Sequence, residues 1–302
     1  MSDMASLDPR RARVDPMSGL TPARQHACST PAGPTSSATQ ALAIRTVIFQ
    51  SIDDRPRIKH RISTPMSGAS SLSSLDRPLA KPDTHLAEFV RFHGAWLDGL
   101  GIRDRPWLIL GSAPDPTVPP ELFPSHARID INNAGRTAAA LGLGRADLTL
   151  RAKKKSWAEH PHIDTRGLLW IHTAPRFLLR PLLINKPYDH IGRVAPLRRR
   201  DREAMVTHVS GASVEMIGDL GKVTNGVAAI CYGLLLGVPE IVVAGISLSK
   251  TGHSYDDLGR VRRQVEEDAV ILDRLRTEPR VSTTEDDLAE TAGLRRWRPS
   301  NG

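Results

Sequence analysis

The chain has little cysteine and few aromatic residues. Cys28 and Cys231 are the only cysteines in 302 residues, and aromatic residues make up 4% of the chain. Two cysteines in such different sequence contexts exclude a disulfide framework and a cysteine-based zinc site, and they favour a reducing compartment. The scarcity of aromatic residues argues against a stacking surface for single-stranded nucleic acid. We therefore expect no nucleic-acid partner.

The familiar cofactor and metal motifs are also missing. No GxGxxG run and no P-loop lysine is present, so no motif indicates dinucleotide binding or ATP hydrolysis. No HExxH run or clustered set of ligands occurs either. We expect an activity that needs no metal site and no bound cofactor.

The first 84 residues lack the apolar content of a folded domain. They are rich in Pro, Ser and Arg, which predicts a disordered arm, because such a composition buries too little apolar surface to offset chain entropy. Their one apolar patch, residues 41–52, is interrupted by Arg45 and is too short to span a bilayer. Translation from Met66 is an alternative start. We expect a cytoplasmic protein, with peripheral contact to an anionic inner-membrane surface as an option.

Positive charge is in excess. The formal net charge is +8, and basic runs occur at residues 153–155, 198–200 and 295–296. Such runs are either solvated faces or contacts for phosphorylated glycans, anionic lipid or nucleic acid. We expect residues 151–221, which contain Arg176 and Arg180, to form a basic insertion that acts as a lid or binds an acceptor.

Short apolar runs bounded by glycine and proline predict buried strands. Residues 107–110 (WLIL) and 240–244 (EIVVA) have the length and composition of central parallel strands. Residues 227–236 are largely apolar and predict a buried helix that ends at Gly237. We expect a Rossmann-like α/β/α sandwich with a mostly parallel sheet over residues 85–297, although similar helix–strand units recur in unrelated α/β proteins.

Two patterns predict helices near the C-terminus. Apolar residues recur at helical spacing from Val261 to Leu275, which places acidic residues such as Glu267 and Asp268 outside the apolar face. Ser282 and Glu285 have the spacing of a capping box that opens a last helix.

Small and polar residues follow the predicted strands. Gly111, Ser112 and Ala113 come after the first strand and leave backbone amides open to an anionic ligand. Asn132 and Asn133 follow the next strand, where they could contact a base or a ribose, although asparagine pairs also form ordinary turns. Ligands of open α/β sheets bind beyond the carboxyl ends of the strands, so we expect the site there.

The order of these segments resembles a known family. The runs LILGSAP, INNAG, TNGVAAICYGLLLGVPEIVVAGISLS and GHSY are similar to the bacterial CMP-sialic-acid-dependent sialyltransferases and their relatives of unassigned specificity. The resemblance covers residues 107–297, is strongest over 224–255 and is thin over 151–221. It implies a glycosyltransferase that moves a sugar from a nucleotide-sugar donor, with a CMP-linked acidic sugar preferred, to a bacterial surface glycan, which the basic runs allow to be anionic.

The resemblance also implies which residues hold the nucleotide. They are the glycine turn, the following asparagine and the start of the buried helix: Gly111, Ser112, Ala113, Asn132, Thr224, Asn225 and Gly226. Ser112 stands where the family usually has asparagine, and Asn225 replaces a serine. Both replacements keep a side chain that forms hydrogen bonds.

Two catalytic positions depart from the family. Of two tyrosines that support the departing phosphate, Tyr255 matches the second and Ser249 replaces the first. The family's histidine base would fall at Arg263 or Gln264, neither of which accepts a proton at neutral pH. His253 is the nearest substitute, with an ordinary pKa near ~6.5, although such loop histidines are more often solvated polar residues.

Two other functions remain open. A degenerate relative would bind a nucleotide or a glycan without turnover. A pterin diphosphokinase-like enzyme would need ATP and a divalent metal, for which Asp115, Asp256 and Asp257 are the available carboxylates.

Overall fold

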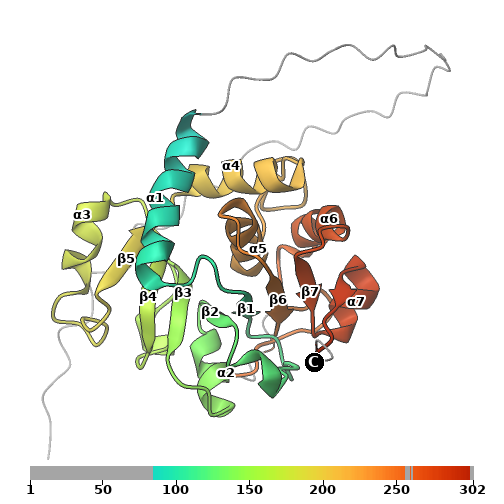
Figure 1. The fold of residues 1–302 in the computed structure, drawn as a ribbon, viewed down its shortest axis with the longest axis horizontal. Helices are drawn as coiled ribbons and strands as arrows, with labels where there is room; N and C mark the ends of the chain where they lie inside the picture. The colour runs from blue at the N-terminus through green and yellow to red at the C-terminus, as the bar shows by residue number, and fades with distance from the viewer. Residues whose placement is uncertain (1–83, 256–258, 260, 300–302) are drawn as a thin grey trace, which may run out of the picture. The chain divides into compact units, whose positions relative to one another are not determined.

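An eight-stranded sheet organises the chain (Figure 1). The computed structural model describes residues 84–255, 259 and 261–299. The strand order is β5-β4-β3-β2-β1-β6-β7-β8, and every neighbouring pair is parallel. The strands are β1 (Trp107–Leu110), β2 (Ala127–Ile131), β3 (Ala146–Ala152), β4 (Thr165–Ile171), β5 (Arg193–Pro196), β6 (Ile241–Ala244), β7 (Val281–Thr283) and β8 (Arg295–Arg296). The arm expected at residues 1–84 lies outside the described residues except for Thr84.

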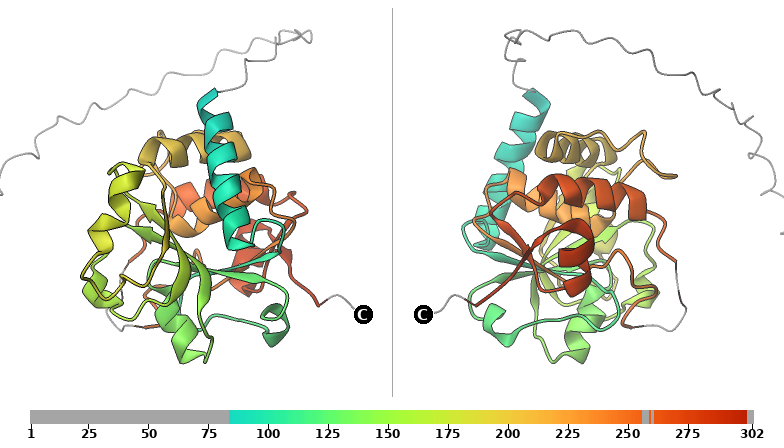
Figure 2. Two further views of the ribbon diagram at one scale, coloured as in Figure 1. Left: turned by 60° about the vertical axis from the view of Figure 1, so that its left-hand side comes forward. Right: turned by 90° about the vertical axis from the view of Figure 1, so that its right-hand side faces the viewer.

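Helices cover both faces of the sheet (Figures 1 and 2). Trp107 and Ile109 pack into a core with α1, α4, α5 and α6, while Leu108 and Leu110 face α2. The Rossmann-like α/β/α sandwich is therefore confirmed. The α-helices are α1 (Thr84–Leu100), α2 (Ala134–Ala140), α3 (Arg176–Leu179), α4 (Arg199–Ser210), α5 (Asn225–Leu235), α6 (Val265–Leu275) and α7 (Asp286–Ala292), with 3₁₀ turns η1 (Pro120–Leu122), η2 (Trp157–Glu159) and η3 (Pro181–Leu183).

The order in which strands are added to the sheet reverses at β1. Strands β2 to β5 extend outward on one side of β1, and the chain then returns through α4 and α5 to place β6 on the other side. Residues 151–221, expected to be an insertion, supply β4 and β5 to this sheet and also contain helix α4. In open α/β sheets, such a reversal of strand order leaves a crevice at the carboxyl ends of the strands.

The buried helix α5 forms as its sequence predicts. The Thr224 side chain caps its first turn by accepting from the Val227 amide at 3.5 Å. Gly237 follows the helix with a φ of 81°, a left-handed conformation that suits glycine. This geometry fixes where the helix begins, directly beside the crevice.

The C-terminal helices differ from expectation in three respects. Helix α6 begins at Val265, whereas Val261 is 77% exposed outside it. Glu267 and Asp268 are buried instead of solvated. Their carboxylates accept hydrogen bonds from the amides of Leu220 and Thr224, which offset the cost of burial. The capping box predicted from Ser282 and Glu285 does not form.

Ser282 lies inside β7, so it does not cap the last helix. The carboxylate of Glu285 instead accepts the backbone amides of Gly245 at 2.7 Å and Thr117 at 3.0 Å. Glu285 thus ties the loops after β1 and β6 to the start of α7.

Candidate functional site

A pocket of about 380 Å³ lies at the carboxyl ends of β1, β2 and β6, beside the start of α5. We call it the switch-point pocket, because it lies where the order of strands reverses. Its lining residues are Gly111, Ser112, Ile131, Asn132, Lys155, Leu220, Lys222, Thr224, Asn225, Gly226, Gly245, Ile246, His253, Val261, Arg262, Arg263 and Gln264.

Two glycines let the loops after β1 and β6 cross at the floor of the pocket. A Cβ atom on Gly111 would lie 2.1 Å from the Gly245 carbonyl oxygen. The amides of Gly111 and Ala113 donate to the carbonyls of Ala244 and Gly245, each at 2.8 Å. These two amides, expected to be open to an anion, are thus engaged within the sheet.

Asn132 joins the start of α5 to the end of β3. Its Oδ1 atom accepts from the Asn225 side chain at 2.9 Å and from the Ala152 amide at 3.1 Å. Asn225 in turn accepts from the Arg202 guanidinium at 3.2 Å. Asn132 holds a left-handed φ of 55°, which asparagine tolerates better than most residues. Of the three predicted asparagines, Asn132 and Asn225 therefore line the pocket in one hydrogen-bonded chain.

Asn133 lies behind the pocket and is fully buried. Its side chain accepts from Arg151 at 2.7 Å, and it donates to Glu159 at 2.8 Å and to the Tyr255 hydroxyl at 3.2 Å. Arg151 also donates to the Asn132 carbonyl at 3.0 Å. Asn133 is therefore placed to position Tyr255 and the backbone of Asn132.

His253 and Tyr255 stack on each other beside Asn133. Their ring centroids are 5.0 Å apart and the rings are nearly parallel, with an angle of 6° between their planes. The Ser112 hydroxyl lies 3.1 Å from His253 Nδ1, and the Ser112 carbonyl accepts the Ser254 amide at 3.0 Å. His253 lines the pocket, while Tyr255 lies beside it.

Ser249 lies apart from the other candidate residues. Its hydroxyl donates to Asp287 at 3.0 Å, and Asp287 also accepts from the Ser247 hydroxyl. Ser249 does not line the switch-point pocket as the structure describes it.

The pocket is strongly cationic. Lys155, Lys222, Arg262 and Arg263 line it, and none of the described lining residues is acidic. Gln264 donates its amide to the carbonyls of Lys222 and Val223 at 3.0 and 2.7 Å, so this side chain fixes the loop before α5. A ligand with negative charge suits this lining best.

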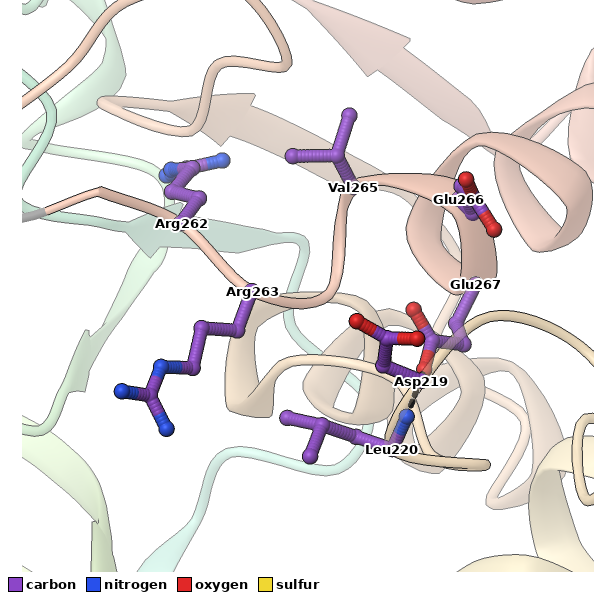
Figure 3. A pocket seen from close by; sticks show the side chains of 7 residues that line it. All are labelled: Asp219, Leu220, Arg262, Arg263, Val265, Glu266 and Glu267. Carbon is purple, nitrogen blue, oxygen red and sulfur yellow. Dashed lines mark hydrogen bonds between the residues drawn. The ribbon is translucent and has the colours of Figure 1, made fainter. Parts of the chain in front are cut away.

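A neighbouring cavity of about 430 Å³ has a different character (Figure 3). It shares Leu220, Arg262 and Arg263 with the switch-point pocket. In Figure 3 the two arginines lie on one side, and Asp219, Glu266 and Glu267 lie on the other. Since its charges offset one another, this cavity is less suited to an anion than the switch-point pocket.

Asp268 is a titratable group beneath the start of α5. It is 1% exposed and accepts the Thr224 amide at 2.7 Å. Burial raises its pKa from 3.8 to about 6, while the bonds from Thr224 and the charges of Arg262 and Arg202 oppose that rise. The pKa of this carboxyl group is therefore well above that of a solvated aspartate.

Sequence reasoning noted the basic run at residues 153–155 but did not predict which cationic residues line the pocket. Lys222 and Lys155 belong to irregular loops, and only the fold brings them to the pocket. Arg151 did carry a signal, because it is the next-to-last residue of β3, and the structure buries it fully. A charge at the carboxyl end of a buried strand is a usable marker of a polar site.

Within residues 84–255, 259 and 261–299, no group of three or more His, Cys, Asp or Glu side chains is placed to hold a metal ion. No helix in the same residues combines the length and the apolar character needed to cross a membrane. The carboxylates of Asp256 and Asp257 lie outside the described residues, and Asp115 is exposed.

Comparison with known proteins gives similar structures only. No family model and no curated protein matches the chain. The Campylobacter jejuni sialyltransferase CstII in complex with CMP-3FNeuAc is 12% identical, with a TM-score of 0.36, over 64% of this chain and 86% of that one. Sialyltransferase CST-II with a trisaccharide acceptor and CMP is 14% identical, with a TM-score of 0.38, over 65% and 88%. Such values assign no family or activity, and the fold assignment rests on the sheet itself.

Proposed function

We propose that the chain is a glycosyltransferase whose switch-point pocket binds a nucleotide-activated sugar. The donor we favour is a CMP-linked acidic sugar, and the acceptor is a bacterial surface glycan. The observation that carries the proposal is a cationic pocket at the point where strand order reverses, with asparagine side chains at its wall. The donor class comes from the sequence resemblance.

The lining suits a ligand with two anionic groups. Lys222, Arg262 and Arg263 would pair with the phosphate and with the carboxylate of the sugar. Asn132 and Asn225 supply amide groups of the kind that recognise a base or a ribose. The pocket holds about 380 Å³, which falls in the range of small-ligand sites.

In the proposed reaction an acceptor hydroxyl attacks the anomeric carbon of the sugar. The new carbon–oxygen bond forms while the bond from that carbon to the CMP phosphate breaks, and CMP leaves with the bonding pair. The hydroxyl proton passes to Nε2 of His253. That role requires the tautomer in which Nδ1–H donates to Ser112, 3.1 Å away, so Ser112 would set the tautomer.

Calorimetric titration of the full chain with CMP, UMP, GMP and AMP, with and without magnesium, tests the donor assignment. We expect selective, metal-independent CMP binding. Arg263→Ala should weaken CMP binding about tenfold, because it removes a charge-assisted contact. Arg274→Ala is the matched control, since this exposed arginine lies on α6 outside the pocket. Equal affinity of both variants would contradict the site.

A donor-turnover assay tests the chemistry separately. His253→Ala should keep CMP binding and lose at least about a hundredfold in the rate of transfer, the usual contribution of a general base. Wild-type transfer rates in His253→Ala would remove His253 from the reaction.

One observation favours a second candidate, a nucleotide-binding protein without turnover. Gln264 stands near the family's base position, and its amide is fixed by the carbonyls of Lys222 and Val223. This candidate predicts CMP binding with no loss of donor sugar in the same assay. A preference for ATP with magnesium would instead point to the diphosphokinase.

A further inference from the structure

A second cavity opens beside the switch-point pocket, at the carboxyl ends of β3 and β4. It measures about 320 Å³ and shares Lys222 with the switch-point pocket. We call it the basic side pocket. Its lining residues are Ala152, Lys153, Lys154, Ile171, His172, Thr173, Arg199, Arg202, Glu203 and Lys222.

Hydrogen bonds within the chain hold the wall between the two pockets. The Ala152 amide, on the side-pocket face, donates to Asn132 on the other face at 3.1 Å. Arg202 donates to Asn225 at 3.2 Å across the same wall and also to the Val223 carbonyl. Molecules bound in both pockets would therefore meet near Lys222.

The charge of the basic side pocket is not balanced. Five basic residues line it, with Glu203 the one acid among the described lining residues. Glu203 is already paired with Arg199 at 2.6 Å. Lys153 and Lys154 are exposed and form no ion pair with any described residue. Two lysines without acidic partners can take an oxyanion with little rearrangement.

His172 adds a neutral hydrogen-bond donor to this lining. Its Nδ1 atom accepts the Ala174 amide at 2.9 Å, which places the ring proton on Nε2. Burial and the charge of Lys153 lower the pKa of His172, which favours the neutral ring. Ile171 and the aliphatic stems of the lysines give the pocket an apolar part that suits the face of a sugar ring.

We propose that the basic side pocket binds the acceptor, and that the acceptor is a saccharide carrying an oxyanion, either a phosphate monoester or a carboxylate. The word acceptor rests on the proposed function. The oxyanion would lie between Lys153 and Lys154, with the sugar against Ile171 and His172. The acceptor hydroxyl would then project past Lys222 toward the donor.

The test is calorimetric titration of the full chain with glucose 6-phosphate, glucuronate, glucose and inorganic phosphate. We expect at least one of the two anionic sugars to bind and neutral glucose not to bind. The double variant Lys153→Ala/Lys154→Ala should lose about tenfold or more in affinity for that sugar. Lys186→Ala/Arg274→Ala removes the same charge from exposed positions outside both pockets and should change nothing.

Three results would overturn the proposal. They are no binding of either anionic sugar, equal weakening by both double variants, and binding of inorganic phosphate as tight as that of the sugar. Lys153→Ala/Lys154→Ala should keep wild-type affinity for CMP, so a failure here is distinguishable from a failure of the donor site. Absence of CMP binding in the wild-type chain would instead contradict the proposed function and with it the word acceptor, while binding of the anionic sugar in the basic side pocket would stand.

Discussion

Arg151 shows how one buried charge organises several site residues. Its guanidinium is fully buried and donates to the Asn132 carbonyl, the Asn133 side chain and the Ser156 carbonyl. It also lies over the ring of Trp157 at 4.5 Å. The asparagines that line and support the pocket therefore depend on a residue that touches no ligand in the proposed reaction.

Replacing Arg151 by methionine should lower the free energy of unfolding by about 3 kcal/mol, because three acceptors, of which the Asn133 side chain is fully buried, lose their donor. Urea denaturation followed by circular dichroism measures the change. Arg166→Met on the adjacent strand is the control, since its exposed ion pair with Asp147 contributes less than about 1 kcal/mol. An effect of equal size in both variants would contradict this role for Arg151.

Asp268 should make the stability depend on pH. Its pKa in the folded chain, about 6, lies above the usual 3.8, so the ionised form is disfavoured by folding. Its contribution to stability is greatest below the unfolded pKa and is lost as the pH rises through about 6. Asp268→Asn keeps a carbonyl acceptor for Thr224 and carries no titratable proton.

The fall in unfolding free energy from pH 4.5 to 7.5 should therefore be about 2 kcal/mol smaller in Asp268→Asn than in the wild-type chain. Denaturant titrations at the two pH values measure it. Asp273→Asn, exposed on the same helix, should keep the wild-type difference. If Asp268→Asn also keeps it, Asp268 does not titrate as described.

At the scale of elements, the close crossing of the loops after β1 and β6 depends on the absence of side chains. Gly111→Ala would place a methyl group 2.1 Å from the Gly245 carbonyl oxygen, and backbone at that position cannot yield as a side chain can. We expect a loss of about 3 kcal/mol in unfolding free energy or a loss of soluble protein.

Gly144→Ala is the matched control for Gly111→Ala. No atom lies within 4 Å of the Cβ position at Gly144, and its φ is not in the left-handed region. Thermal denaturation of both variants compares them directly. If Gly111→Ala is as stable as Gly144→Ala, the crossing is looser than the structure indicates.

At the scale of the whole molecule, residues 84–299 contain all the described strands and the three hydrophobic clusters. We propose that the folding domain spans the residues expected from the sequence, about 85–297. A chain that starts at Pro82 should unfold in one transition with the midpoint of the full chain. Circular dichroism during heating compares the two, and a lower midpoint for the shorter chain would mean that earlier residues stabilise the domain.

Attraction between the cationic pockets and an anionic ligand should contribute to binding at the carboxyl edge of the sheet. Both pockets have a cationic lining, so the affinity for CMP should fall as salt rises from low to physiological concentration. Calorimetry at several sodium chloride concentrations measures the slope. Affinity that does not change with salt would argue against an anionic ligand in the switch-point pocket.

The sequence by itself determined the local elements near the site. Strands β1 and β6 were predicted to within one residue at each end, and helix α5 to within two, because each is a short apolar run with its own cap or glycine. Asn132 was named from its position after a predicted strand, Asn225 and His253 were named from the family resemblance, and the structure brings all three to one pocket. Their roles in binding and catalysis remain predictions.

The tertiary structure decided the charge of the pockets and the burial of polar groups. Lys155, Lys222 and Arg263 are far apart in the sequence and meet only because β1 separates β2 from β6. Glu267 and Asp268 follow a helical pattern that predicts exposure, yet they are buried. Their carboxylates accept hydrogen bonds from amides of a distant loop, which a local pattern cannot reveal. Local periodicity reports one element at a time, whereas hydrogen-bond partners and neighbouring charges depend on how distant elements pack together.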